Sequence, residues 1–592
     1  MVLAYEQSYI ERMLAVLEQL DDPNTSGYIW LRAYEYHYQQ EIFSAILNKP
    51  SETASAAPKA QLIFCMDDRE ESVRRHLEEL APDYETLGAA GVFGMPNNWQ
   101  ALDAPKPLKL AQPVVTAVHS FLEVPDPEDL KDLAAHEKRQ HWFSRLRQLK
   151  NHGMRQSVWR TFWGLAFMLP YAVGELIGRT LSAGTYQRWF QKRETLLGVP
   201  LTTRVDYTAT EVLACPTLEH NQLGLSQDEK VKQVVNFLKL TGFTQDFSEL
   251  VVLMAHRSRQ MNNPHILGYG CGACSGRFGI PNARAFVSSV NEPEIKARLA
   301  AEHDIHIPPN SWWVAGDHDT TSDDVAWPDA DLVPATHRTL FQQVQQAVKQ
   351  AVALSAHERC RKFASAPTYL TAAQAKRHVE NRAASPDQVR AELGHQGCAV
   401  AFIAPRRLSK HVFWDRRSFL ISYNPTQDPE GRWLEAQLQG NGVVGIGIAM
   451  DYYFSRMQNG YFGSGSKVTH NLTGLFGVME GASSDLRTGL AQQMVELHEP
   501  MRLLVVVEAE LATLGLIYAR HAYLKQLLDN EWVLLAVKPP NTNEIHQFKA
   551  GKGFVRWEGM VHKLPQAPHS TDWYLGHHGY LPPALITGDD HA

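Results

Sequence analysis

The chain has 592 residues, of which 44% are hydrophobic and 20% are charged. This composition is typical of an ordinary folded protein and excludes a disordered or fibrous chain. The formal net charge of −7 provides no broad basic field for a phosphate backbone, so we expect no nucleic-acid partner. Six cysteines are too few to staple a chain of this length, which indicates a reducing compartment.

The first predicted elements are helices. Residues 1–50 alternate charged and apolar positions at helical spacing and show no signal-peptide pattern, so we expect an N-terminal helical segment in a cytoplasmic protein. After a Ser/Ala/Pro linker, the apolar run at 60–64 predicts a buried strand and residues 68–80 predict a helix. Further strands are expected at 86–94 and 113–119.

Residues 127–196 are rich in charged and aromatic helix formers and predict a large helical insertion. Its most apolar stretch, from Trp163 to Gly174, is shorter than the roughly 20 residues needed to span a bilayer. We expect a buried helix pair kinked at Pro170. The alternative is an exposed docking surface for a membrane partner.

The remainder of the chain alternates helices with apolar strands, which predicts an α/β fold with a mostly parallel sheet core and large helical insertions. We expect a core over residues 60–330, a C-terminal α/β part packed on it over 331–564, and an extended surface tail over 565–592, which is rich in Pro, Gly and His. The individual helices are expected at 230–240, 338–353, 371–380 and 507–528, and the strands at 250–255, 399–404, 501–507 and 532–537.

Two polar motifs directly follow predicted strands. Cys65, Asp67 and Arg69 stand at alternate positions directly after the strand expected at 60–64. His256 directly follows the strand expected at 250–255, and Cys271 lies in a glycine-dense loop soon after it. The carboxyl ends of strands in an α/β sheet converge, so these side chains are expected to meet. Two thiols, an imidazole and a carboxylate complete a tetrahedral zinc site. We therefore predict Zn²⁺ bound by Cys65, Asp67, His256 and Cys271.

Other interpretations of these motifs stay open. Cys271 and Cys274 form a C-x-x-C pair, which also suits a redox pair or half of a structural zinc knuckle. His265, in the same loop, is a rival to His256 as a ligand. The remaining thiols are expected to be inert packing residues: Cys215, Cys360 and Cys398.

Two further histidines, His318 and His470, either support the metal site or shuttle protons, or are ordinary hydrogen-bonded histidines. The run from Gly463 to Lys467 resembles a phosphate-binding loop only superficially, because the Walker spacing is absent. We therefore expect no nucleotide.

Several longer motifs surround the predicted ligands. They are FCMDDREESVRRHLE (64–78), AGVFGMP (90–96), HRSRQMNNPHILGYGCGACSGR (256–277), DHDTTSDD (317–324), FIAPR (402–406) and YFGSGSKVTHNLTGLFGVMEGASSDLRTGL (461–490). Together these motifs resemble one known family, that of the DabA-type inorganic carbon transporter subunits, and the C-x-D-x-R turn is similar to that of β-carbonic anhydrases. The resemblance implies a β-carbonic-anhydrase-like zinc core with Cys65, Asp67, His256 and Cys271 as the ligands.

A zinc site with four protein ligands has no room for the water that CO2 hydration requires. We therefore expect Asp67 to leave the metal and to pair with Arg69, whose guanidinium binds a carboxylate through two hydrogen bonds. Asp67 and Arg69 are thus the expected catalytic residues, and their exchange would act as a gate.

The resemblance also implies a physiological role, namely energy-coupled uptake of inorganic carbon, with CO2 converted to bicarbonate. It implies a membrane-embedded, antiporter-like partner of the DabB type, and a peripheral position on the cytoplasmic side of the cell inner membrane. Carbonic-anhydrase-like hydration is expected only when the chain is coupled to that partner. The alternatives are a stand-alone soluble β-type carbonic anhydrase and a non-catalytic scaffold with a structural zinc.

Overall fold

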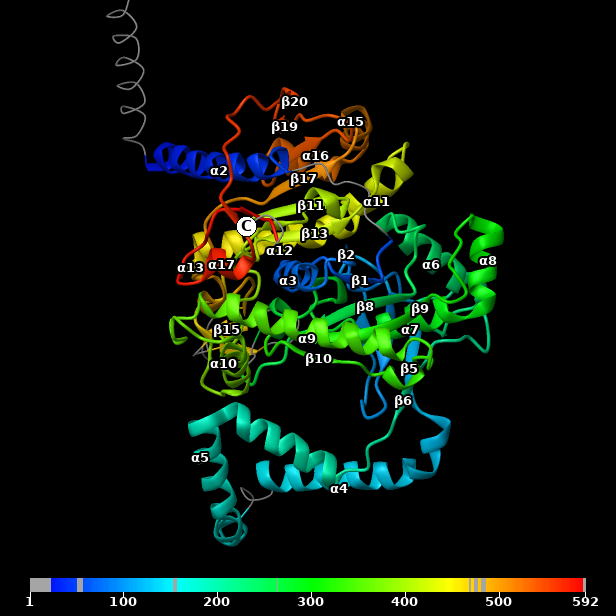
Figure 1. Ribbon diagram of the computed structural model, residues 1–592. Helices are drawn as coiled ribbons and strands as arrows, with labels where there is room; N and C mark the ends of the chain where they lie inside the picture. The colour runs from blue at the N-terminus through cyan, green and yellow to red at the C-terminus, as the bar shows by residue number, and fades with distance from the viewer. Residues whose placement is uncertain are drawn as a thin grey trace, which may run out of the picture.

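The computed structural model describes residues 23–49, 57–152, 157–262, 265–467, 470–472, 478–480 and 486–588 (Figure 1). Two mostly parallel sheets form the body, and helices cover their faces. The α/β class with helical insertions is confirmed. Of the predicted N-terminal helical segment, helix α2 (Pro23–Leu47) is described and residues 1–22 lie outside the described ranges.

The first sheet has the strand order β10-β9-β8-β1-β2, and only the β9–β10 pair is antiparallel. Its central strands are continuous apolar runs because helices cover both faces. On one face lie α3 and α9, and on the other α6, α7 and α8. The bounds are β1 Ala60–Cys65, α3 Glu71–Leu80, β2 Tyr84–Ala89, α6 Gln227–Thr241, β8 Leu250–Arg257, α7 Ile280–Asn291, α8 Pro293–His303, β9 Trp312–Asp319, β10 Asp324–Ala326 and α9 Arg338–Cys360.

The second sheet has the order β13-β11-β17-β18-β19-β20, in which β13, β11, β17 and β18 run parallel. Helices α11, α12, α15 and α16 pack on one face, and α2 packs on the other. The bounds are β11 Val400–Ala404, β13 Ser418–Ser422, α11 Arg432–Gln439, α12 Asn441–Met457, β17 Leu504–Glu508, α15 Leu511–Arg520, α16 Ala522–Asp529, β18 Leu534–Lys538, β19 His546–Lys549 and β20 Gly553–Arg556.

The two sheets meet where β2 lies beside β13. The amide of Leu420 donates to the carbonyl of Met66 at 3.0 Å, and the amide of Gly88 donates to the hydroxyl of Ser422 at 2.9 Å. A Cβ on Gly88 would lie 1.7 Å from the Leu420 carbonyl oxygen, so only glycine permits this approach. The end of β1 therefore lies next to the second half of the chain.

Helices α4 (Leu133–Asn151) and α5 (Val158–Leu197) occupy the predicted insertion, after the 3-10 helix η2 (Pro127–Asp132). The expected burial of this helix pair is wrong, because Trp159 is 75% exposed and many of its apolar neighbours are also exposed. The apolar residues of this segment correctly predicted helices, but they did not show whether those helices are buried or exposed. The kink is present: α5 bends by 61° between Ala166 and Met168, one turn before Pro170.

Three other segments differ from expectation. The strand expected at 113–119 begins only at His119, as β5 (His119–Pro125), and the helix expected at 507–528 is divided into α15 and α16. The predicted extended surface tail is wrong as well, because Tyr574 and Ala584 are fully buried. This segment forms β21 (Gln566–Ala567), α17 (Ser570–Tyr574) and β22 (Ala584–Ile586), and β22 pairs with β12 (Val412–Phe413). Its apolar residues thus form a separate small core with Phe413.

The remaining helices and strands join these layers. Within the described ranges, no single helix is both long and apolar enough to cross a membrane, whereas the bent halves of α5 pass that test of length and composition together. The remaining bounds are β3 Asn97–Gln100, β4 Leu108–Leu110, β6 Thr203–Asp206, β7 Gln222–Leu223, α10 Ala372–Ala384, α13 Asn459–Phe462, β14 His470–Leu472, β15 Val478–Glu480, β16 Leu486–Arg487 and α14 Gln492–Val495.

Candidate metal centre

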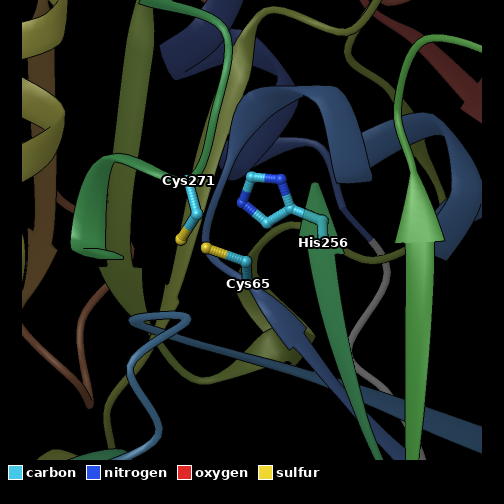
Figure 2. Close-up of side chains that lie close together, drawn as sticks. All are labelled: Cys65, His256 and Cys271. Atoms are coloured by element: carbon cyan, nitrogen blue, oxygen red, sulfur yellow. The ribbon is translucent and has the colours of Figure 1, made fainter. Parts of the chain in front are cut away.

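Three of the four predicted ligands converge. The thiols of Cys65 and Cys271 and one ring nitrogen of His256 all lie within 4.8 Å of one another, and all three residues are buried (Figure 2). Cys65 ends β1 and His256 lies near the end of the adjacent parallel strand β8. The rule that strand ends in an α/β sheet converge therefore holds here.

The loop that carries Cys271 is shaped by glycines, as predicted. The amide of Cys271 donates to the Arg277 carbonyl at 2.8 Å, which closes the loop. A Cβ on Gly270 would lie 2.1 Å from the Gly276 carbonyl oxygen, and Gly276 has a φ of +71°. Both positions need glycine, and together they turn the thiol of Cys271 towards Cys65.

Gly91 borders the two thiols and was not identified from the sequence. A Cβ at this position would lie 2.8 Å from Cys271 Sγ and 3.1 Å from Cys65 Sγ. Gly91 follows β2, the other neighbour of β1. The strand order β8-β1-β2 could have drawn attention to it, because the segment after β2 must reach the same edge of the sheet.

The donor set fits a thiophilic divalent metal. Neither ring nitrogen of the buried His256 has a hydrogen-bond partner among the described residues, and such orphaned buried groups are rare. Hydrogen bonding with Cys271 and burial raise the pKa of the Cys65 thiol well above its ordinary value. Burial alone would lower the pKa of His256, but electrostatic interaction with the neighbouring Cys65 and Asp67 raises it to about 9. A cation would satisfy all three side chains.

Asp67 lies beside this trio but is paired with Arg69. The Arg69 guanidinium donates to both carboxylate oxygens of Asp67 at 2.8 Å, and the Arg69 amide donates to Oδ1 at 3.0 Å. Asp67 Oδ2 lies 3.4 Å from His256 Nε2. Burial alone would raise the pKa of Asp67, but Arg69 holds it well below its usual range. Asp67 is therefore an anion bound to Arg69, within reach of the trio.

Arg69 is in turn fixed by groups that the sequence did not indicate. Its guanidinium donates to Glu392 Oε1 at 3.0 Å and to the carbonyls of Tyr269 and Gly270, which adjoin Cys271. Glu392 is fully buried and accepts a second hydrogen bond from Ser258 at 2.6 Å. Arg69, the partner of Asp67, is thus held by the loop before Cys271 and by Glu392 from the second half of the chain.

A second buried cluster adjoins Asp67. His395 donates through Nδ1 to Asp68 and lies 3.6 Å from Asp67 Oδ1, so these three residues form the other group with metal-ligand geometry in the described ranges. Burial raises the pKa of Asp68, and His395 opposes that rise. His395 was also missed, since a lone histidine outside any strand-end motif carries no signal in the sequence.

The other predicted polar residues fall outside the trio. His318 bonds to Glu70 at 2.8 Å and Asp323 at 3.1 Å, as an ordinary hydrogen-bonded histidine does. The side chain of His470 lies outside the description, so its role stays a prediction. Lys467 of the superficial phosphate-loop motif donates to the Tyr269 hydroxyl at 2.7 Å.

The redox-pair and zinc-knuckle alternatives for the cysteine loop stay predictions. All six cysteines are free thiols, so Cys271 and Cys274 are not bonded to each other. His265 belongs to no metal-capable group in the described ranges, whereas His256 does. Cys360 and Cys398 are buried as predicted, but the packing role expected for Cys215 is wrong because Cys215 is exposed.

Comparisons with known proteins assign the family. A family model described as "Probable inorganic carbon transporter subunit DabA" matches residues 1–533. Proteins of that name are similar over nearly the whole chain: one from Methylococcus capsulatus is 43% identical over 99% of this chain and 55% of its own length. One from Dechloromonas aromatica is 44% identical over 95% and 55%, and one from Nitrosococcus oceani is 41% identical over 98% and 53%. The chain spans about half the length of these curated relatives. It belongs to the family of probable inorganic carbon transporter subunits DabA.

Proposed function

We propose that this chain is the zinc-binding subunit of an energy-coupled system that takes up inorganic carbon by converting CO2 to bicarbonate. The names of its relatives support the uptake of inorganic carbon. The cluster of Cys65, His256 and Cys271 supports zinc as the metal, because it offers two soft donors and one borderline donor in a buried place.

The single observation that carries the proposal is the pairing of Asp67 with Arg69 next to three converging ligands. A fourth ligand from Asp67 would close the site, and its capture by Arg69 leaves one position for water. Zinc in this site would supply the positive charge that makes water nucleophilic towards CO2 near neutral pH. Arg69 holds the Asp67 carboxylate through two hydrogen bonds. Because Gly91 has no side chain, space is left next to the thiols of Cys65 and Cys271.

Net hydration converts CO2 and H2O to bicarbonate and a proton, so uptake requires that the proton leaves and that the reverse reaction is suppressed. A gate at Asp67 meets the second requirement, because return of the carboxylate to the metal would stop dehydration of accumulated bicarbonate. Energy for this cycle would come from a membrane-embedded, antiporter-like subunit of the DabB type that conducts cations. The chain would then work on the cytoplasmic side of the cell inner membrane as a peripheral subunit.

Metal analysis of the purified chain tests the base of this proposal. We expect close to one zinc per chain, and loss of zinc in Cys65→Ala and His256→Ala. The matched control is Cys360→Ala, which removes a buried thiol outside the cluster and should leave zinc in place. A folded wild-type chain without metal would refute the zinc site.

Carbon dioxide hydration measured by stopped flow then separates the roles. We expect little activity from the isolated chain and clear activity from membranes that also contain the antiporter-like subunit. Strong activity of the isolated chain would instead identify a stand-alone carbonic anhydrase. Full carbon-dependent growth with Arg69→Ala would identify zinc as structural only.

A further inference from the structure

Helices α4 and α5 form an arm that extends from the body of the molecule (Figure 1). The C-terminal half of α5 attaches the arm to α10. The Gly184 amide donates to Asn381 Oδ1 at 3.0 Å, and Arg188 pairs with Glu380. The N-terminal half of α5 leads away from this attachment and presents its side chains to the surroundings.

That half of α5 is apolar and exposed. Trp159 is 75% exposed, Leu176 is 66% exposed, and Phe162, Trp163 and Leu169 are each more than half exposed. A helix that is apolar around most of its circumference belongs in a protein core or in lipid. A group of large exposed aromatic and aliphatic side chains on one helix marks an interaction surface.

The part of the chain that leads into this apolar helix, from Lys138 on α4 to Arg160 and called the basic flank below, is strongly basic, although the whole chain carries a net charge of −7. Between Glu137 and Glu175 there is no acidic residue. On α4, Lys138, Arg139 and Arg145 are exposed. The basic residues of the stretch are Lys138, Arg139, Arg145, Arg147, Lys150, Arg155 and Arg160.

The geometry of α5 favours a position along a membrane surface. Pro170 cannot donate to the Ala166 carbonyl, and the helix bends there by 61°. A second break follows at Ser182, whose φ of −159° and ψ of 75° are not helical. The piece before the first bend, Val158–Ala166, is about 14 Å long at the usual helical rise, and the piece between the two breaks, residues 168–181, is about 21 Å long, against about 30 Å of bilayer hydrocarbon. A short apolar segment next to basic residues is suited to the boundary between headgroups and acyl chains.

We propose that the exposed half of α5 inserts into the surface of a lipid bilayer that contains anionic lipids, with the basic flank on α4 against the headgroups. Tryptophan side chains at that depth place an apolar ring in lipid and a polar N–H near the headgroups. This inference deepens the proposed function, since it identifies how the subunit meets the membrane, but it involves none of the zinc ligands.

Charge complementarity favours lipid over a protein partner as the occupant. The apolar side chains alone would suit either. A basic stretch without acidic residues, which precedes them in the chain, suits the negative surface potential of an anionic leaflet, to which each nearby Lys or Arg adds attraction. The attraction is screened by salt.

Co-sedimentation of the full chain with lipid vesicles tests this proposal. We expect the wild type to bind vesicles of phosphatidylcholine mixed with phosphatidylglycerol. Its affinity for pure phosphatidylcholine vesicles should be lower by at least about tenfold. Added salt should weaken the binding to anionic vesicles. The double variant Phe162→Glu/Trp163→Glu and the triple variant Lys138→Glu/Arg139→Glu/Arg145→Glu should each lose at least about tenfold in affinity.

The matched control is Val114→Glu/Tyr369→Glu, which places the same charges at two sites on the body that are 74% and 77% exposed. It should bind vesicles almost as the wild type does.

All substituted side chains are at the surface, so each variant should keep its thermal midpoint and zinc content. Wild-type chain that ignores bare anionic vesicles and binds only membranes containing the antiporter-like subunit would overturn the proposal. Equal binding of wild type and arm variants would also overturn it. A metal-free chain that still binds vesicles would refute the zinc site alone.

Discussion

The guanidinium of Arg69, which binds both oxygens of Asp67, donates to the carboxylate of Glu392 at 3.0 Å across 323 positions of sequence. The side chains of Arg69 and Glu392 are both almost completely buried. A buried guanidinium held between two carboxylates has little freedom to turn. Glu392 therefore determines where Arg69 can receive Asp67, and it links the second half of the chain to the metal centre.

Glu392→Gln should impair the gate while leaving the zinc ligands unchanged. The amide keeps the shape of the side chain but loses the charge that orients Arg69, so CO2 hydration by the membrane-coupled protein should fall about tenfold to a hundredfold. Zinc content should stay at the wild-type level. The visible spectrum of the cobalt-substituted protein should also change, because Asp67 would return to the metal.

The control for this variant is Glu302→Gln, which alters a surface carboxylate that pairs with Arg298 through the same kind of contact. It should leave hydration and the cobalt spectrum unchanged. An unchanged spectrum and rate in Glu392→Gln would show that Glu392 has no part in positioning Arg69.

Arg69→Ala should lock the site closed. Without the guanidinium, Asp67 has the metal as its remaining strong partner, so zinc should be retained while hydration is lost. The variant also leaves the charge of Glu392 uncompensated in the interior, which should destabilise the fold by about 3 kcal/mol or more. Arg69→Lys keeps the charge without the two-pronged contact and should be more stable than Arg69→Ala but equally inactive.

Zinc analysis, denaturant unfolding and hydration rates on both Arg69 variants provide the check. Normal hydration by a folded Arg69→Ala variant would contradict the gate.

The convergence of Cys65, His256 and Cys271 could be predicted from the sequence because each residue follows a local rule. Cys65 and His256 end apolar runs that can only be buried strands, and Cys271 lies among glycines that its loop requires. Glu392 and His395 could not be predicted, because their partners at the candidate metal centre, Arg69 and Asp68, are more than 300 positions away and no periodicity marks them. Apolar periodicity gave α5 as a helix, but it does not distinguish a core from a surface that faces lipid, so the prediction of burial failed.

Gly91→Ala should disturb the metal centre without touching a ligand. Its new methyl group would lie 2.8 Å from Cys271 Sγ, which is closer than a carbon and a sulfur can approach, so the thiols must move apart. We expect zinc affinity to fall on the order of tenfold and stability to fall by about 1–3 kcal/mol. Competition with a zinc-binding dye and thermal unfolding measure the two effects.

The matched control is Gly447→Ala on the exposed side of α12, where a Cβ would meet nothing within 4 Å. It should gain about 0.5–1 kcal/mol of stability, because alanine restricts the unfolded chain and favours a helix. Equal zinc affinity in Gly91→Ala and wild type would show that the space at Gly91 is not needed.

Acid should weaken the junction between the two halves of the chain through Glu78. Burial alone would raise the pKa of Glu78, but Arg406, which donates to it at 2.7 and 3.0 Å, lowers the pKa from 4.5 to about 2. Because the folded pKa is depressed, this stabilisation is fully present above pH 4.5 and is lost as the pH falls towards 2. A shift of this size corresponds to about 3 kcal/mol at neutral pH.

Glu78→Gln should therefore unfold at a lower temperature than the wild type at neutral pH, and the difference between the two thermal midpoints should shrink as the pH falls below 4.5. The variant also leaves Arg406 buried without its counter-charge, which adds a loss that persists at all pH values where the protein is folded. Thermal unfolding of both proteins over a pH series separates the two parts. A gap between the midpoints that stays constant with pH would show that the Glu78 charge does not stabilise the junction.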